Sequence, residues 1–284
     1  VAGRTMYIGL GSLRVQTTAL MMFYVPVYGA ILYKYRGGGL AAFAKALLWM
    51  LVPVVLVFRF PSIVIAAIML ISMLVQLTIA LSKGWFKVPV KSTIALLWVL
   101  AITSPIIYSS SDLLEYQAVR LREFFLGTGD SLWLTHVLRD LSDVAIIGGS
   151  NKEVIGYLPD FNRDYIFSYV LNTYGILVGV LLIGVLAALV LSIFSTAINQ
   201  KNQLGCVMGC GCGMILLMNI TINLLVCIGI VPVTSCFLPF FSAGCSNIVL
   251  SYALVGIALS IYRYKNVYPQ HVSTKLVLKK MSVE

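Results

Sequence analysis

Charged residues are scarce in this sequence of 284 residues. They make up 11% of the chain, whereas a soluble globular domain carries roughly a quarter, and apolar residues reach 60%. Water cannot be the main solvent of such a chain, so we expect no soluble domain. A hydrocarbon core of about 30 Å requires roughly 20 apolar residues per helix. Several uncharged runs reach that length, which predicts a polytopic integral membrane protein.

Acidic residues are almost confined to one segment. Outside it the chain has only Glu284, and nine of its ten acids lie between residues 109 and 164: Asp112, Glu115, Glu123, Asp130, Asp140, Asp143, Glu153, Asp160 and Asp164. A connection of this length exceeds any tight turn, and its apolar stretches predict short helices on the membrane surface. Long loops on rigid scaffolds commonly carry function, so residues 109–164 are the first candidate for a site.

Metal-ligating residues are also few. His136 and His271 are isolated, and neither supports a metal site. Four cysteines alternate with glycines in one apolar run, which contains no histidine or carboxylate: Cys206, Cys210, Cys212 and Cys227. Small residues at such spacing predict close helix packing rather than metal binding. Cys236 and Cys245 lie near a turn and are candidates for pairing, although their spacing does not require it.

The apolar runs predict seven membrane spans in one domain, residues 1–284. Lys45, near the start of the second run, is the one charged residue that they contain. They cover residues 17–33, 41–58, 62–81, 92–108, 165–194, 206–230 and 246–262. The fifth run is overlong, so we expect a single helix that is tilted or extends beyond the bilayer. The predicted fold class is therefore all-α: a transmembrane helical bundle with one large loop. We find no internal repeat of the kind that marks inverted-repeat transporters.

The lysines and arginines of the short connections predict the orientation. Most fall on one side of the predicted bundle: Lys34, Arg36, Lys45, Lys83, Lys87, Lys91, Lys201, Arg263, Lys265, Lys275, Lys279 and Lys280. This side should be cytoplasmic and should include the C-terminus, which places the acidic loop outside. The formal charge of +10 is explained by anionic headgroups beside apolar spans, so no nucleic-acid partner is expected.

Two motif blocks carry a resemblance to a known family. Residues 158–167 read Leu-Pro-Asp-Phe-Asn-Arg-Asp-Tyr-Ile-Phe, and a glycine-bearing segment follows at 174–179. Residues 231–234 read Val-Pro-Val-Thr, and residues 238–247 read Leu-Pro-Phe-Phe-Ser-Ala-Gly-Cys-Ser-Asn. In order and spacing these blocks resemble the shape, elongation, division and sporulation (SEDS) family of RodA, FtsW and SpoVE. Weaker agreement at residues 3–8 and 116–121 implies that three family helices would precede Val1.

The resemblance implies an activity and a location. Members of this family polymerise peptidoglycan in the bacterial cytoplasmic membrane, joining the sugars of lipid II while undecaprenyl diphosphate leaves. They work beside a class B penicillin-binding protein that crosslinks the glycan. No organic cofactor is implied, although a divalent cation, Mg²⁺ or Mn²⁺, is a candidate for neutralising the diphosphate.

The resemblance also assigns roles to individual residues. Asp164 matches the family's required Asp and would act as the general base, although an acid at a helix start also caps free amides. Arg120 would contact the leaving diphosphate, or pair with a nearby acid. Asp160 would help to hold the cation, or remain a solvated loop acid. The remaining substrate-binding candidates are one cation beside Asp164 and three hydroxyls: Arg163, Thr234, Ser242 and Ser246. Ordinary hydrogen bonding in turns and helix caps is the alternative for the hydroxyls.

Two other functions stay open at this point. Several family positions are changed, such as Ala-Gly-Cys at residues 243–245 in place of Tyr-Gly-Gly, and these losses favour a non-catalytic or truncated scaffold protein. The third candidate is a flippase for lipid-linked precursors, which would require polar groups at mid-membrane depth. Asn172, Asn219 and Asn223 are the main such groups, and hydrogen bonds between helices are their expected use.

Overall fold

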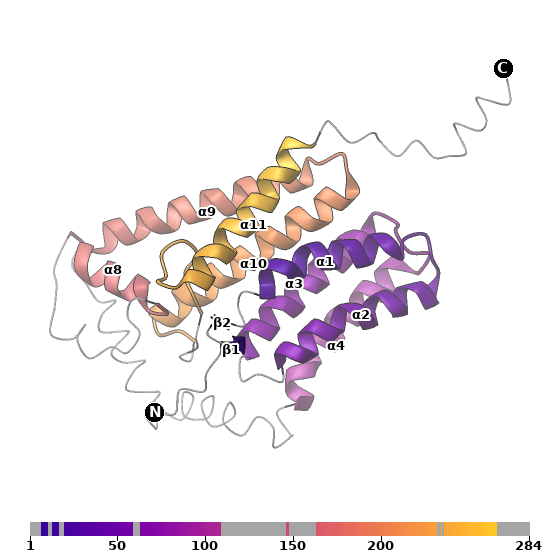
Figure 1. The fold of residues 1–284 in the computed structure, drawn as a ribbon, viewed down its shortest axis with the longest axis horizontal. Helices are drawn as coiled ribbons and strands as arrows, with labels where there is room; N and C mark the ends of the chain where they lie inside the picture. The colour runs from indigo at the N-terminus through magenta and orange to yellow at the C-terminus, as the bar shows by residue number, and fades with distance from the viewer. Residues whose placement is uncertain are drawn as a thin grey trace.

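The structure is a computed structural model that describes residues 7–10, 13–16, 20–58, 63–108, 146–147, 163–231, 234 and 236–265 (Figure 1). Its helices are α1 (Leu20–Lys34), α2 (Leu40–Phe58), α3 (Ile63–Ser82), α4 (Val90–Tyr108), α8 (Ile166–Tyr174), α9 (Ile176–Ile198), α10 (Gln203–Cys227) and α11 (Cys245–Arg263). The predicted surface helices of the acidic loop, together with Arg120 and Asp160, lie outside the described residues.

Each of the seven apolar runs contains at least one helix, so the predicted helix positions are confirmed. Among the described residues, four helices are long and apolar enough to cross a membrane: α3, α9, α10 and α11. Shorter apolar stretches lie within α2 and α4. Many large apolar side chains on α9 and α11 face outward, including Leu181 and Tyr252, as expected for helices that contact lipid.

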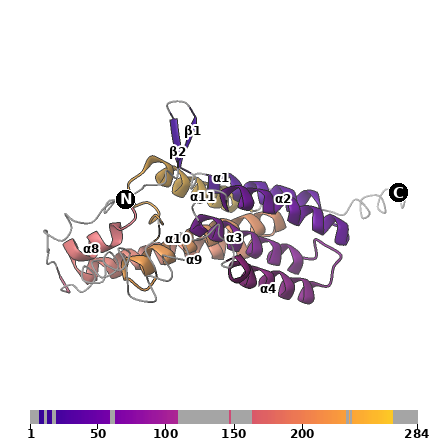
Figure 2. The same cartoon turned by 90° about the horizontal axis from the view of Figure 1, so that it is seen from below.

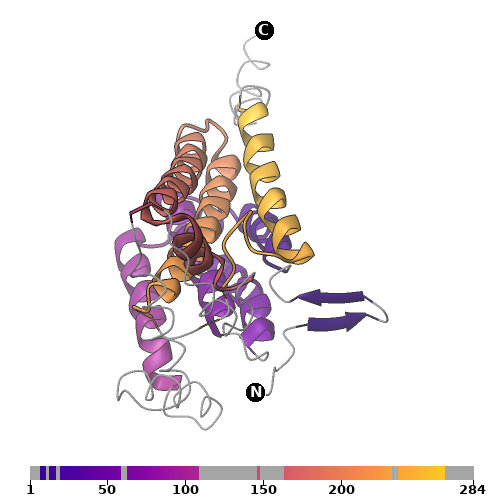
Figure 3. The ribbon, with the colours of Figure 1, turned by 90° about the vertical axis from the view of Figure 1, so that its left-hand side faces the viewer.

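The predominantly helical fold agrees with the predicted class, but the start of the chain adds a β-hairpin that the sequence analysis did not predict. Strands β1 (Tyr7–Leu10) and β2 (Leu13–Gln16) pair antiparallel, with Tyr7 opposite Gln16 and Leu10 opposite Leu13. Figures 2 and 3 show this pair standing away from the helices. The physical reason is local, because Gly-Ser between two short runs is a combination that favours a two-residue hairpin turn.

The fifth apolar run also differs from its prediction as one long helix. It breaks at Gly175, whose φ of 89° lies in the region that favours glycine, and α8 and α9 meet there at an angle (Figure 1). The two helices pack together where α9 lacks a side chain, since a Cβ on Gly179 would overlap Leu171 of α8. The break turns α8 back toward the end of α10.

Helix α10 is the centre of the bundle and packs against α1, α3, α8, α9 and α11. Its glycines let neighbours approach closely: a Cβ on Gly209 would lie 2.7 Å from the Cβ of Ala197, and one on Gly211 would lie 2.6 Å from Nε2 of Gln76. The predicted packing role of this glycine–cysteine run is thereby confirmed. Cys236 is a buried free thiol and Cys245 an exposed one, so the two are not paired in this structure.

Gly209→Ala is expected to destabilise the bundle by about 1–3 kcal/mol, because the new methyl group meets a rigid alanine rather than the end of a flexible side chain. Gly184→Ala on α9 is the control, since nothing lies within 4 Å of its Cβ position. Thermal unfolding in detergent measures both variants. An equal melting temperature for the two would contradict the close α9–α10 packing.

Candidate functional site

Residues of the two motif blocks are joined by one buried hydroxyl. Ser242, in the connection between α10 and α11, donates a hydrogen bond from Oγ to the backbone oxygen of Arg163 at 2.6 Å. The same Oγ accepts a hydrogen bond from the backbone N–H of Leu238, also at 2.6 Å. Residues 79 positions apart in the chain are therefore held against each other just before Asp164.

A buried amide on α10 holds the next residue. Nδ2 of Asn223 donates to the backbone oxygen of Asp164 at 2.7 Å and to the backbone oxygen of Cys236 at 2.6 Å. The thiol of Cys227 lies 3.9 Å from the same Asp164 oxygen and 3.7 Å from Oδ1 of Asn223. The carbonyls of residues 163 and 164 are thus fixed by two different elements, the 236–242 connection and α10.

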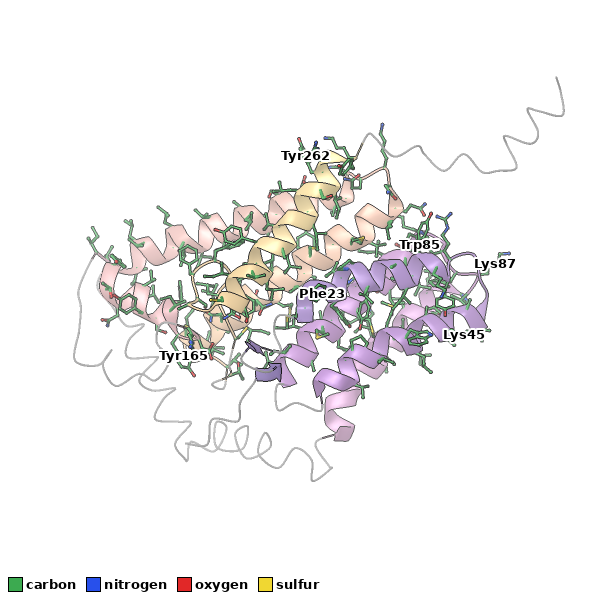
Figure 4. The ribbon with its side chains drawn as sticks, viewed as in Figure 1. Phe23, Lys45, Trp85, Lys87, Tyr165 and Tyr262 are labelled. Carbon is green, nitrogen blue, oxygen red and sulfur yellow. The ribbon has the colours of Figure 1, made fainter. Side chains whose placement is uncertain are left out.

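The start of α8 positions Asp164 outside the helix. The N-cap residue is Tyr165, whose side chain makes no capping hydrogen bond, and α8 has no acid in its first turn. Asp164 therefore precedes the N-cap, and its side chain is half-buried. Helix α8 is anchored by Ser168, whose Oγ donates to the backbone oxygen of Cys227 at 3.2 Å. In Figure 4, the neighbouring Tyr165 lies at the opposite end of the bundle from Trp85 and Lys87.

Asp164 is the only acidic residue in the described part of the chain, and its charge reaches into the site. Burial raises the pKa of the Cys236 thiol, and the negative charge of Asp164 raises it further. The thiol therefore stays protonated at neutral pH, and it donates to the backbone oxygen of Asn219 at 3.5 Å.

The structure brings only part of the predicted set together. Arg163, Asp164 and Ser242 are adjacent through the Ser242 hydrogen bond, and Arg163 itself is exposed. Thr234 is half-buried in the same connection as Ser242, and its hydroxyl finds no hydrogen-bond partner within the described residues. Ser246 lies in the first turn of α11 and is half-buried.

Sequence reasoning missed the role of Asn223. Hydrogen bonds between helices were the expected use of the three buried asparagines, but Asn223 bonds two non-helical carbonyls and Asn219 donates to Ile215 of its own helix at 2.8 Å. Oδ1 of Asn172 is buried without a partner among the described residues. The sequence signal for Asn223 was its amide near the end of an apolar run. Such an amide indicates that a polar partner exists but does not identify the partner.

The described residues contain no group of three or more His, Cys, Asp or Glu side chains that would hold a metal ion. Asp164 is the one carboxylate among the described residues. A divalent cation bound with its substrate's phosphates needs few protein ligands, because Mg²⁺ commonly keeps one or two carboxylates and several waters. Asp160, the predicted ligand of the cation, lies outside the described residues.

Comparison with known proteins identifies relatives in the family that the two motif blocks resemble. The model of a family described as cell cycle protein, FtsW/RodA/SpoVE, matches residues 1–267. The probable peptidoglycan glycosyltransferase FtsW of Enterococcus hirae is 36% identical over 107 residues, which is 37% of this chain and 27% of that protein. The corresponding protein of Thioalkalivibrio sulfidiphilus is 27% identical over 281 residues, covering 93% of this chain and 67% of that protein. Stage V sporulation protein E of Bacillus subtilis is 28% identical over 41% of this chain and 32% of that protein.

Two solved structures share the fold. A chain from a peptidoglycan synthase complex, described as coordinating polymerization and crosslinking, matches with a TM-score of 0.70 at 22% identity, over 92% of this chain and 73% of that one. The rod shape determining protein RodA of Thermus thermophilus matches with a TM-score of 0.59 at 21% identity, over 94% and 71%. The matches to the Enterococcus and Bacillus relatives named above span about a third or less of those proteins' own length. The family model matches well over half of the 284 residues of this chain, and the chain therefore belongs to the FtsW/RodA/SpoVE family of cell cycle proteins.

Proposed function

We propose that this protein is a membrane glycosyltransferase that polymerises peptidoglycan strands from lipid II. The observation that carries the proposal is the meeting of both motif blocks at Asp164. Ser242 holds the backbone carbonyl of the residue before it, and Asn223 holds the carbonyl of Asp164 itself. The names of the relatives from Enterococcus and Thioalkalivibrio support the same activity. A half-buried carboxylate on a backbone that is held in place is suited to proton transfer, which requires a defined geometry.

The chemistry assigns one step to Asp164. Its carboxylate takes the proton from the attacking sugar hydroxyl, and that oxygen forms a bond to the anomeric carbon of the donor sugar. The bond from this carbon to the phosphate oxygen breaks, and its electron pair leaves with undecaprenyl diphosphate. Positive charge near the diphosphate lowers the barrier; we assign this to Arg120, to Arg163 and to a Mg²⁺ or Mn²⁺ ion held in part by Asp160. Thr234 and Ser246 are assigned to the sugar.

We infer seven spans in this chain, with the end that carries Asp164 facing the outside of the bacterial cytoplasmic membrane. The opposite end carries lysines such as Lys45 and Lys87 (Figure 4), as the positive-inside rule requires for a cytoplasmic face. Hydrogen bonds tie the connections there, with the N–H of Gly37 donating to the oxygen of Trp85 at 2.6 Å. The long acidic loop is then outside and the C-terminus inside.

We also propose a class B penicillin-binding protein as partner, because the related synthase complex is described as coordinating polymerization with crosslinking. Glycan that is polymerised at the outer end of this bundle would need a transpeptidase on the same face of the membrane. The large apolar surfaces of α9 and α11 are available to lipid or to a partner's membrane helix.

The test is a polymerisation assay with full-length protein, its penicillin-binding partner and lipid II in Mg²⁺ or Mn²⁺. We expect glycan polymer, and we expect EDTA to lower the rate at least about tenfold until cation is restored, since the ion neutralises the leaving diphosphate. Gel separation of labelled glycan measures both. Lipid II that is bound but not polymerised would overturn the proposal in favour of a scaffold, and lipid II that crosses vesicle membranes unpolymerised would favour a flippase.

A further inference from the structure

One side chain of α10 joins two backbone carbonyls that would otherwise repel each other. The oxygens of Asp164 and Cys236 both accept a hydrogen bond from Nδ2 of Asn223, which is fully buried. We propose that Asn223 is a positioning residue for glycan polymerisation, because it fixes Asp164 against the connection between α10 and α11. The inference rests on the proposed function and adds a residue to its machinery.

The donor chemistry at this point is specific. Two carbonyl oxygens need two hydrogens, and a primary amide nitrogen supplies both from one atom. A carboxylate of the same size has no hydrogen to donate, and a hydroxyl has one. The distances of 2.7 and 2.6 Å leave no room for a longer linker without movement of one carbonyl. Asparagine is therefore the residue that meets both the reach and the donor count.

The amide itself is held in one orientation. The thiol of Cys227, one helical turn further along α10, lies 3.7 Å from Oδ1 of Asn223, so the oxygen of the amide faces the thiol and the nitrogen faces the carbonyls. The backbone of α10 is fixed by its central place in the bundle. Asn223 therefore ties the backbone of Asp164 to α10, the central helix of the described structure.

A loss of these donors would take the amide hydrogen bonds from both carbonyls, and the 163–164 segment would lose this link to the connection. General-base catalysis is sensitive to such movement, since a displacement of about 1 Å can cost roughly a hundredfold in rate. Substrate binding depends on groups spread along both connections, so affinity for lipid II should change little. The expected signature is a fall in kcat with a nearly constant KM.

The experiment compares Asn223→Leu with Gln76→Leu in the full chain with its partner. Both variants replace a fully buried amide by a side chain of similar volume, but Gln76 donates to Ser72 of its own helix, away from the site. We expect Asn223→Leu to lower kcat about 30- to 100-fold with KM within about threefold, and Gln76→Leu to leave kcat within about threefold. Asn223→Leu should lower the melting temperature more than Gln76→Leu, because it takes hydrogen bonds from two backbone carbonyls. Both variants are therefore assayed at a temperature at which circular dichroism shows them folded, so that a fall in kcat reports positioning and not loss of fold.

Asn223→Gln keeps both donors on a longer side chain and should restore part of kcat relative to Asn223→Leu. Full kcat in Asn223→Leu, while Asp164→Asn is inactive, would overturn the positioning role and leave the proposed function standing. Polymerisation by Asp164→Asn would instead overturn the proposed function. Hydrogen exchange of peptides from 163–174 and 236–244 tests the link without activity: faster exchange in Asn223→Leu than in Gln76→Leu supports it, and equal exchange overturns it.

Discussion

Asp164→Asn is expected to abolish polymer formation from lipid II, with a fall in kcat of about 10²- to 10⁴-fold, the range that general-base catalysis contributes. The change preserves the shape of the side chain but removes its negative charge and its ability to take up a proton. Because the backbone of Asp164 is held through its carbonyl by Asn223, the variant should keep the fold and the hydrogen bonds of the site. Gel analysis of labelled glycan measures the loss.

The matched control is Lys45→Gln, which also alters the net charge by one unit. Lys45 is exposed at the opposite end of the bundle from Tyr165 (Figure 4), so its loss should leave polymerisation unchanged. Both variants should bind lipid II and unfold near the temperature of the unmodified protein. Polymer made by Asp164→Asn at a rate comparable with that of Lys45→Gln would show that this carboxylate is not the base.

The helix positions of this fold were accessible from sequence because a helix satisfies the backbone hydrogen bonds of a long apolar run without help from water. The apolar runs therefore located α1 to α4 and α9 to α11. The break at Gly175 was not accessible, because α8 and α9 are both apolar and hydrophobicity does not change across it. The hairpin of Tyr7 to Gln16 was missed because four-residue strands give a weaker signal than spans.

The site shows the same division between local and tertiary information. Asp164 and Ser242 were named because each sits in a motif that can be read along the chain. Asn223 was not, because its role depends on two carbonyls, Asp164 and Cys236, that come together only when α10, the start of α8 and the connection before α11 are packed. A polar residue in an apolar span signals that a partner exists, while the identity of that partner is a property of the fold.

Ser242→Ala is expected to destabilise the protein and to slow polymerisation about tenfold, because one hydroxyl serves two buried backbone groups. Its loss removes a hydrogen bond from the oxygen of Arg163 and another from the N–H of Leu238, and a buried group that loses its partner costs about 1–3 kcal/mol. Ser192→Ala is the control, since Ser192 is exposed on α9 and donates only to Leu189 of its own helix. Thermal unfolding and the polymerisation assay should both separate the two variants.

Ser242 and Asn223 hold adjacent residues, so their effects should not be additive. Once one carbonyl of the 163–164 pair is released, the other hydrogen bond loses part of its geometric support, and contacting residues commonly show coupling of about 0.5–3 kcal/mol. A double-mutant cycle with Ser242→Ala and Asn223→Leu measures this coupling in both stability and kcat. Ser242→Thr, which keeps the hydroxyl, should retain most of the activity. Additive losses in the cycle would mean that the two side chains stabilise separate parts of the fold and that Asp164 is not held by both.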